Sequence, residues 1–335
     1  MKQKKIPILF GIFFALFILF CMISVVSGSY RIPLNRFWEI LTGNGTAAEN
    51  LALLDIRLPR MCIGILVGVA LSVSGVVLQT VTKNPLAEPG MIGINAGAAL
   101  LVVLFITASK SVYYDTLSVN RVIALPLIAI LGGGLACFLV YFLAKKKGIR
   151  PVRLILVGIG VNSGINAIIS YIQLTSSRGD FNQVLTWTNG SLWGSSWLYV
   201  KMVSVFVVLL LIYVIWKIRV LDVLQLGEEL ATGLGISVQK ETRNLFFAAA
   251  MLAAVATAVA GNIAFLGLLG PQIAKRLVGG RMRYLIPLSG MIGASILVLS
   301  DTIARNLFSP VELPVGIVVS MIGVPYFVYL MLKEK

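Results

Sequence analysis

Long apolar segments separated by short polar stretches run through the whole chain. A helix needs about 20 consecutive apolar residues to cross a bilayer, so this pattern predicts a bundle of membrane-spanning helices. The eighth segment is short and contains Gly267, Gly270 and Pro271, and irregular backbone there must be buried in protein. The ten predicted segments are 6–26, 57–83, 91–108, 121–144, 151–174, 196–216, 242–260, 262–280, 283–304 and 313–332.

The first segment follows three lysines and could also be interpreted as a signal peptide. Its apolar run is longer than a typical signal core, and Phe20 before Cys21 is too bulky for a lipoprotein cleavage site. We therefore expect a first membrane helix, then a polar excursion over residues 27–56. The second helix is expected to start near Arg57.

Composition agrees with an all-α polytopic membrane protein, because 58% of the residues are hydrophobic and 12% are charged. The formal charge of +15 comes from basic residues at the ends of apolar runs, which argues against nucleic acid as a partner. If ten segments alternate in direction, most of the 28 lysines and arginines lie on the side of the two termini. The positive-inside rule then predicts that both termini are cytoplasmic.

A weak internal similarity relates the two halves of the chain. At a shift of 186 residues, Gly75 and Pro85 fall on Gly261 and Pro271, and the fourth helix similarly matches the ninth. Helices five crossings apart run in opposite directions, so we expect an inverted repeat of helices 2–5 and 7–10, a common transporter plan. The predicted single permease domain, 1–335, then divides into a first helix and outer loop (1–56), a first repeat (57–174), an outer interfacial helix with the sixth helix and a cytosolic loop (175–241), and a second repeat (242–335).

The fifth segment carries small and polar side chains three or four residues apart, which places them on one face of a helix. Two interpretations stay open, the wall of an aqueous path and a seam of interhelical hydrogen bonds. The sequence has no histidine, no phosphate-binding loop and no metal-ligand cluster, so we expect neither an enzyme nor a cofactor. The small and polar face of the fifth segment, called the polar stripe below, consists of Gly158, Asn162, Asn166, Ser170 and Gln173.

Three arginines are expected at the outer ends of helices. Arg57 and Arg60 share a face of the second helix, and Arg305 lies near the end of the ninth. Three outer cations suggest an acidic partner. The alternatives are interfacial snorkelling and, for Arg305, an ion pair with Asp301 one helical turn away.

The longest predicted inner loop, 220–240, has Leu226, Leu230 and Leu234 at intervals of four residues. Its glycines divide it into a short helix pair with one apolar face. Such short helices are marginal in water and need a supporting surface. The acidic residues Glu228 and Glu229 argue against anionic lipid and favour a protein groove.

The polar break between the second and third helices reads NPLAEPG from Asn84 to Gly90. Asn84 is a good cap for a turn that begins with Pro85, and Glu88 suits the positive end of that turn. Pro89 and Gly90 then interrupt the turn at once. The sequence predicts a short irregular link between two packed helices.

This break closely resembles the NPLAEPG signature of the permease subunits of bacterial ABC importers for iron-siderophores and cobalamin, the FecCD-type family. Further similarity lies in Arg57-Leu-Pro-Arg60, the 226–235 loop, the Gly267–Pro271 run and Glu312-Leu-Pro-Val-Gly316, in family order. The resemblance departs from the family at Gln272, where the family often carries histidine.

The resemblance implies a permease that passes a ferric siderophore or similar large chelate inward through a bacterial cytoplasmic membrane. It implies as partners cytosolic ATPase subunits, an external substrate-binding protein and a second permease subunit in a homo- or heterodimer, besides membrane lipid. It places the pathway along the fifth helix, and binding-protein docking at Arg57, Arg60 and Arg305. The inner gate is expected at Asn84, Pro85 and Leu86, and ATPase coupling at Gly227, Glu228, Leu230, Gly233 and Leu234.

Two other classes of protein fit parts of this pattern. An ion-coupled secondary transporter suits an inverted repeat, but no carboxylate or histidine is expected at mid-membrane to carry a proton. A purely structural assembly factor does not require the polar stripe. We therefore expect a non-catalytic subunit that depends on a separate ATPase.

Overall fold

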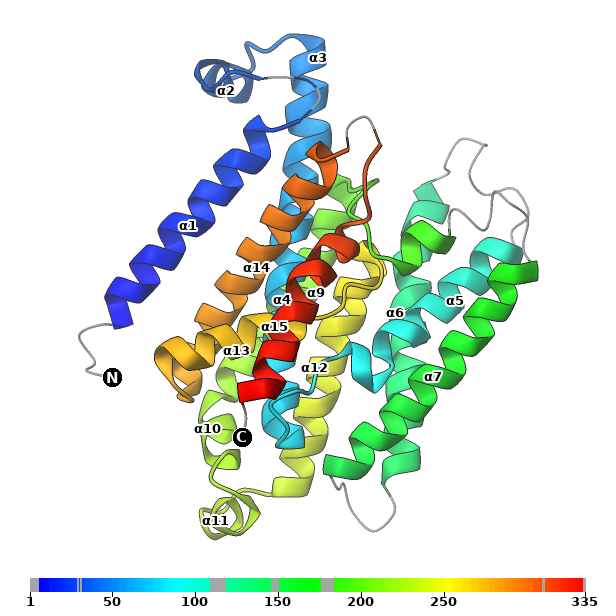
Figure 1. Cartoon of the computed structure of the whole chain (residues 1–335), viewed down its shortest axis with the longest axis vertical. Coiled ribbons are helices and arrows are strands. Elements are labelled where there is room, and N and C mark those ends of the chain that lie inside the picture. The colour runs from blue at the N-terminus through cyan, green and yellow to red at the C-terminus, as the bar shows by residue number, and fades with distance from the viewer. Residues whose placement is uncertain are drawn as a thin grey trace.

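The structure, a computed structural model, describes residues 6–28, 30, 32–108, 119–145, 151–175, 184–308 and 311–333. Over these residues every regular element is helical, which confirms an all-α fold (Figure 1). Eight helices are long and apolar enough to cross a membrane. They are α1 (Ile6–Val26), α4 (Leu58–Thr82), α6 (Val119–Ala144), α7 (Pro151–Thr175), α9 (Trp197–Trp216), α12 (Val238–Ala260), α14 (Met282–Asn306) and α15 (Val315–Lys333).

Each of the ten predicted segments coincides with a helix of the structure. The third corresponds to α5 (Ile94–Ala108) and the eighth to α13 (Leu266–Val278). Both are shorter than a full span, so the count of ten crossings stays a prediction, as do the inverted repeat and the domain divisions.

The second span begins earlier than predicted. Thr46 caps α3 (Ala47–Asn50) in a capping box with Glu49, and the helix continues through a π-helical stretch, η2 (Leu51–Arg57), into α4. Residues 47–82 are therefore one continuous apolar helical stretch. Helix α2 (Leu34–Leu41) belongs to the predicted polar excursion and lies apart from this helical stretch, at the top of Figure 1.

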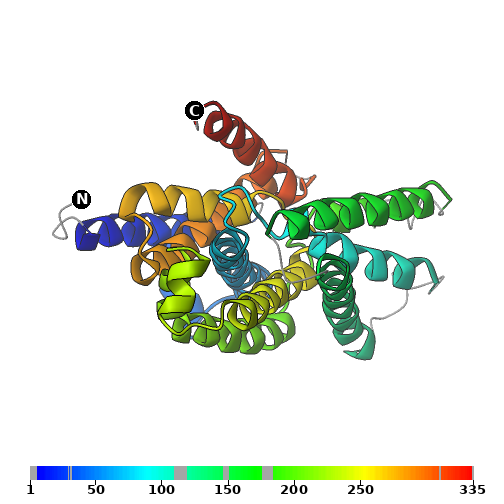
Figure 2. The ribbon, with the colours of Figure 1, turned by 90° about the horizontal axis from the view of Figure 1, so that it is seen from below.

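Helix α4 lies at the centre of the bundle and packs against α12, α13 and α14 (Figures 1 and 2). Its small-residue face makes these contacts close, since a methyl group at Gly68 would meet the backbone of Ala294 at 2.6 Å. Gly75 lies directly against the backbone of Gly267 in α13. Without a strong hydrophobic drive between helices in lipid, close backbone packing of this kind supplies the stabilising contacts.

Irregular backbone was expected around Pro271, but the structure places it before α13. The chain is irregular over residues 261–265, and α13 then runs as a regular helix through Gly267, Gly270 and Pro271. Pro271 lacks the N–H that would bond to the carbonyl of Gly267 four residues back. That oxygen accepts a hydrogen bond from Gln79 Nε2 at 3.3 Å instead, so a neighbouring helix compensates for the proline.

The remaining helices form two flanks. Helices α5, α6 and α7 contact one another on one side of the core, and α1 leans against α14 on the other (Figure 1). At the bottom of Figure 1, α10 (Ile218–Leu224) and α11 (Glu228–Gly233) connect α9 to α12. The bundle thus has an α11 end and, opposite it, an end that carries α2 and α3.

Candidate functional site

The break after α4 forms the turn that its sequence predicts. Helix α4 ends at Lys83, which adopts a left-handed conformation with φ 51°. The Asn84 Oδ1 atom then accepts the backbone N–H of Leu86 at 2.9 Å, so Asn84 caps the turn as expected. The turn leads into the short 3₁₀ helix η3 (Gly90–Ile92), and the predicted gate residues are half-buried.

Helix α13 holds this break from the side. Gln272 Nε2 donates to the carbonyl oxygen of Pro85 at 2.5 Å and to Gln79 Oε1 at 3.2 Å. Pro89 of the break packs against Gly267, where a methyl group would meet the proline ring at 2.7 Å. The position where the resembling family often has histidine is therefore filled by an amide that bonds the break directly.

The position of Glu88 in the sequence suggested that it stabilises the turn that begins at Pro85, but in the structure Glu88 interacts with α13. The backbone N–H of Phe265, the N-cap residue of α13, stabilises its carboxylate. The reason is spatial: the break folds back onto α13, whose N-terminal N–H groups lack partners within the helix. Burial raises the pKa of the Glu88 carboxyl to about 7, although the Phe265 N–H bond lowers it.

A polar chain that the sequence analysis missed crosses the centre of the bundle. Thr257 Oγ1 donates to Asn95 Oδ1 at 3.0 Å, and Asn95 Nδ2 donates to Asn262 Oδ1 at 3.0 Å. The signal was weak, because these residues come from α12, α5 and the 261–265 break and share no periodicity. Asn262 also lines an open pocket of about 600 Å³, together with Thr188, Asn189, Gly316 and Ser320.

The predicted stripe on α7 divides into two parts. Gly158 is buried, and a methyl group there would meet the Ile92 backbone at 2.9 Å, while Asn162 lies beside Gly93. Further along the helix Asn166 and Ser170 are exposed and Gln173 is half-buried.

The hydrogen bonds of this stripe stay within α7. Asn166 Nδ2 donates to the carbonyl oxygen of Asn162 at 2.8 Å and to its Oδ1 at 3.0 Å. Both of these bonds, within the part of the chain that the structure describes, join residues one turn apart on the same helix. The assignment of the stripe to a pathway stays a prediction.

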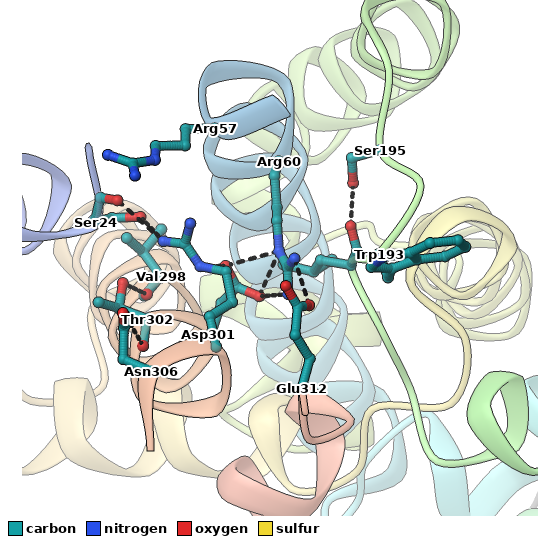
Figure 3. Close-up of polar contacts among 12 residues, drawn as sticks. Ser24, Arg57, Arg60, Trp193, Ser195, Val298, Asp301, Thr302, Asn306 and Glu312 are labelled. Carbon is teal, nitrogen blue, oxygen red and sulfur yellow. Dashed lines mark hydrogen bonds and ion pairs between the residues drawn. The ribbon is translucent and has the colours of Figure 1, made fainter. Parts of the chain in front are cut away.

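The three predicted outer arginines lie at the end opposite α11 and are all buried, and Figure 3 shows Arg57 and Arg60 with their neighbours. Arg60 bridges Asp301 at 2.9 Å and Glu312 at 2.8 Å, so it joins α4 to α14 and to the chain before α15. Arg305 lies 3.3 Å from Asp301, which is the ion pair weighed as its alternative.

Two of these arginines also hold the C-terminal end of α1. Arg57 donates to the carbonyl oxygens of Val25 at 2.7 Å and of Tyr30, and Arg305 donates to that of Ser24 at 3.0 Å. Cations are stabilised at a helix C-terminus, where the last carbonyls have no helical partners. The docking role expected for the three arginines stays a prediction, and of their internal contacts the sequence suggested only the pair of Arg305 with Asp301.

The α11 end presents the predicted leucine row. Leu226, Leu230 and Leu234 are 57%, 60% and 63% exposed, whereas Ala231 is fully buried. Gly227 starts α11 with φ 108°, a conformation available to glycine. Lys83 at the end of α4 pairs with Glu228 at 3.2 Å and so links α11 to the break.

These features define a class of protein. The helical membrane bundle has a broken helix and a hydrogen-bonded polar chain at its centre and a row of exposed leucines at one end. Among the residues that the structure describes, no three His, Cys, Asp or Glu side chains are grouped to hold a metal. This is the arrangement of a transport permease.

Comparison with known proteins gives the family. The model of the FecCD transport family matches residues 16–333, and this chain belongs to that family. It is 46% identical to the iron(3+)-hydroxamate import system permease protein FhuG of Bacillus subtilis, over 100% of this chain and 99% of the relative. It is also 34% identical to the Fe(3+) dicitrate transport system permease protein FecD of Escherichia coli, over 94% of this chain and 95% of the relative.

A solved structure agrees with this assignment. An inward-facing conformation of a metal-chelate type ABC transporter matches with a TM-score of 0.84 and 28% identity, covering 98% of this chain and 99% of the other. The chain is therefore a multi-pass, non-catalytic permease subunit of an ABC importer in the plasma membrane, and ATP hydrolysis belongs to a separate subunit. The ion-coupled transporter kept as an alternative is not supported.

Proposed function

We propose that this chain carries a ferric siderophore, or a similar large iron chelate, from an external binding protein into the cytoplasm. The observation that carries this proposal is the full-length similarity to a permease for iron(3+)-hydroxamate. The assembly pairs the chain with a second permease subunit, identical or related, and with cytosolic ATPase subunits. Both termini are cytoplasmic, which makes the α11 end the inner end and the arginine end the outer end.

We propose that the pathway runs between the polar stripe of α7 and the pocket at Asn189, Asn262 and Ser320. Supporting this, Asn166 and Ser170 are exposed polar groups within a membrane span, and such groups in a membrane protein face water or protein rather than lipid. In a cysteine-free background, cysteine at Ser170 should react with a water-soluble thiol reagent, whereas cysteine at Leu156 should not. The reverse labelling pattern would move the pathway to another face of α7.

We propose that the inner gate lies at Asn84, Pro85 and Leu86, and that an ATPase subunit docks on Gly227, Glu228, Leu230, Gly233 and Leu234. Two observations support this. The break is a non-helical link at the inner end of a central helix, and three exposed leucines near it have no cover within the chain. Exposed apolar side chains in such a row suit a groove on a partner.

We propose that the binding protein docks over Arg57, Arg60 and Arg305 by exchanging an internal carboxylate for one of its own. Glu312 suits this exchange, because its side chain is 37% exposed while that of Asp301 is 3% exposed. A Glu312→Gln variant should then bind the binding protein more tightly at low salt, where exposed charges are least screened. Equal or weaker binding would place the docking surface elsewhere.

The function itself is tested by uptake. The purified permease, reconstituted with its ATPase and binding protein, should import a ferric hydroxamate siderophore into vesicles only when ATP is supplied. Uptake that follows an ion gradient and ignores ATP would contradict the proposal. Import of ferric citrate but not of the hydroxamate would keep the mechanism and change the substrate.

A further inference from the structure

Helix α13 is attached at both of its ends to parts of the chain that the proposed function separates. Its C-terminal end leads into residues 279–281, and Gln225 Nε2 of the α10–α11 loop donates to the Gly280 carbonyl there at 3.0 Å. Next to it, Asp222 Oδ1 on α10 accepts the Met282 N–H at 2.8 Å. A displacement of α10 and α11 therefore acts on the short loop that joins α13 to α14.

The N-terminal end of α13 is attached to the break by Glu88. Phe265 precedes the helix in a left-handed conformation with φ 64° and receives no cap from a side chain of its own segment. Such a conformation is costly for a bulky residue and persists only where the surroundings enforce it. Glu88 is 9% exposed, and its carboxylate is stabilised by the Phe265 N–H at the positive end of α13.

Other contacts in the same place make this attachment stiff. Gln272, two turns into α13, donates to Pro85 of the break at 2.5 Å, and Pro89 packs on Gly267. By contrast, the direct link from α11 to the end of α4 is the pair of Lys83 and Glu228, whose side chains are 45% and 59% exposed. An exposed pair of this kind contributes about 0–1 kcal/mol and forms and breaks easily.

We propose that Glu88 is a positioning residue that joins the break to α13, so that α13 transmits the movement of the α10–α11 loop to the break. The inference rests on the proposed function, because it takes α11 as the surface on which the ATPase acts. The inference adds to the proposed function that movement of the ATPase on α11 reaches the gate through α13. In this account the buried contacts at Glu88 and Gln272 are required for coupling, and the Lys83–Glu228 pair is not.

The test measures siderophore imported per ATP hydrolysed by the reconstituted importer. Glu88→Ala removes the carboxylate from the positive end of α13 and should lower that ratio about fivefold or more, while ATP hydrolysis and ATPase co-purification persist. Glu88→Gln keeps an acceptor oxygen without the charge and should give an intermediate ratio. The matched control is Glu49→Gln, which alters a carboxylate of similar burial in the capping box at the opposite end and should keep the ratio of the parent.

Equal losses of transport and of ATP hydrolysis in Glu88→Ala would show a merely structural role and overturn the inference. If this variant does not assemble, Gln272→Leu carries the same test, since it removes the amide bond to Pro85 and should also uncouple. A normal ratio in Gln272→Leu would then overturn the inference. Absence of ATP-dependent import by the parent protein would refute the proposed function instead, so the two failures are distinguishable.

Discussion

At the arginine end, Arg60 is 5% exposed and lies between Asp301 and Glu312, whereas at the α11 end the break is held by the amide of Gln272 and a half-exposed Lys83–Glu228 pair. Buried ion pairs are costly to break, because removal of one partner leaves an uncompensated charge. Amide bonds and exposed pairs exchange more easily. The proposed outer end is therefore held by buried contacts within the chain, whereas the proposed inner end keeps the exposed leucines on which we propose that a partner docks.

The largest expected effect is at the leucine row. Leu230→Glu places a charge on a side chain that is 60% exposed and should abolish transport and ATPase association, while membrane insertion persists. Co-purification of the ATPase with the tagged permease measures this. Glu39→Lys, which changes an exposed glutamate on α2 at the opposite end of the bundle, is the control and should retain the ATPase. If the Leu230→Glu variant retained it as well, the row would not be the docking surface.

Next in size is the loss of the buried bridge. Arg60→Met should lower the free energy of unfolding by about 3–5 kcal/mol, because Asp301 keeps only its contact with Arg305. Thermal unfolding in detergent should show a clear drop in Tm. A Tm within one degree or so of the parent would mean that the bridge does not lock this end.

A smaller effect is expected at the break. Leu86→Ala should raise ATP-independent leak of substrate from loaded vesicles, since it removes apolar volume from the proposed gate. Leu104→Ala, on an exposed face of α5, is the control and should not leak. No leak in an assembled Leu86→Ala complex would place the gate elsewhere along the pathway.

The smallest effect is expected for the exposed pair at the inner end. Lys83→Met should change the free energy of unfolding by about 1 kcal/mol or less, and the change should shrink further in high salt. Comparison of its unfolding curve with that of Arg60→Met tests the contrast between the ends directly. A loss as large as that of Arg60→Met would remove the contrast.

Much of the fold could be predicted from local patterns. The segment 6–26 was predicted at the bounds that the helix has, because a long apolar run has one stable form in lipid. The Asn84 cap was also predictable, since it depends on neighbouring residues. The early start of the second span was missed, although Thr46 and Glu49 carry the spacing of a capping box.

The long-range contacts could not be predicted from local sequence patterns. Arg60 and Asp301 are 241 residues apart, and nothing in their local spacing pairs them. Glu88 matches an N-terminal position on its own turn, and only the folded chain shows that it serves α13. Pro271 is a helix breaker by local rules, yet Gln79 supplies the missing bond from another helix. Local chemistry predicted the elements, and tertiary packing decided which groups meet.

The most direct test of the proposed coupling measures whether the leucine row acts on the break. In a background in which Cys21, Cys62 and Cys137 are replaced by serine, cysteine is placed at Leu86 and its labelling rate is followed in the reconstituted complex. If the leucine row is coupled to the break, we expect ATP to change this rate. We also expect Leu230→Glu to remove the ATP dependence while the ATP-free rate stays the same. A rate that ignores ATP, or that still responds to ATP in the Leu230→Glu variant, would contradict it.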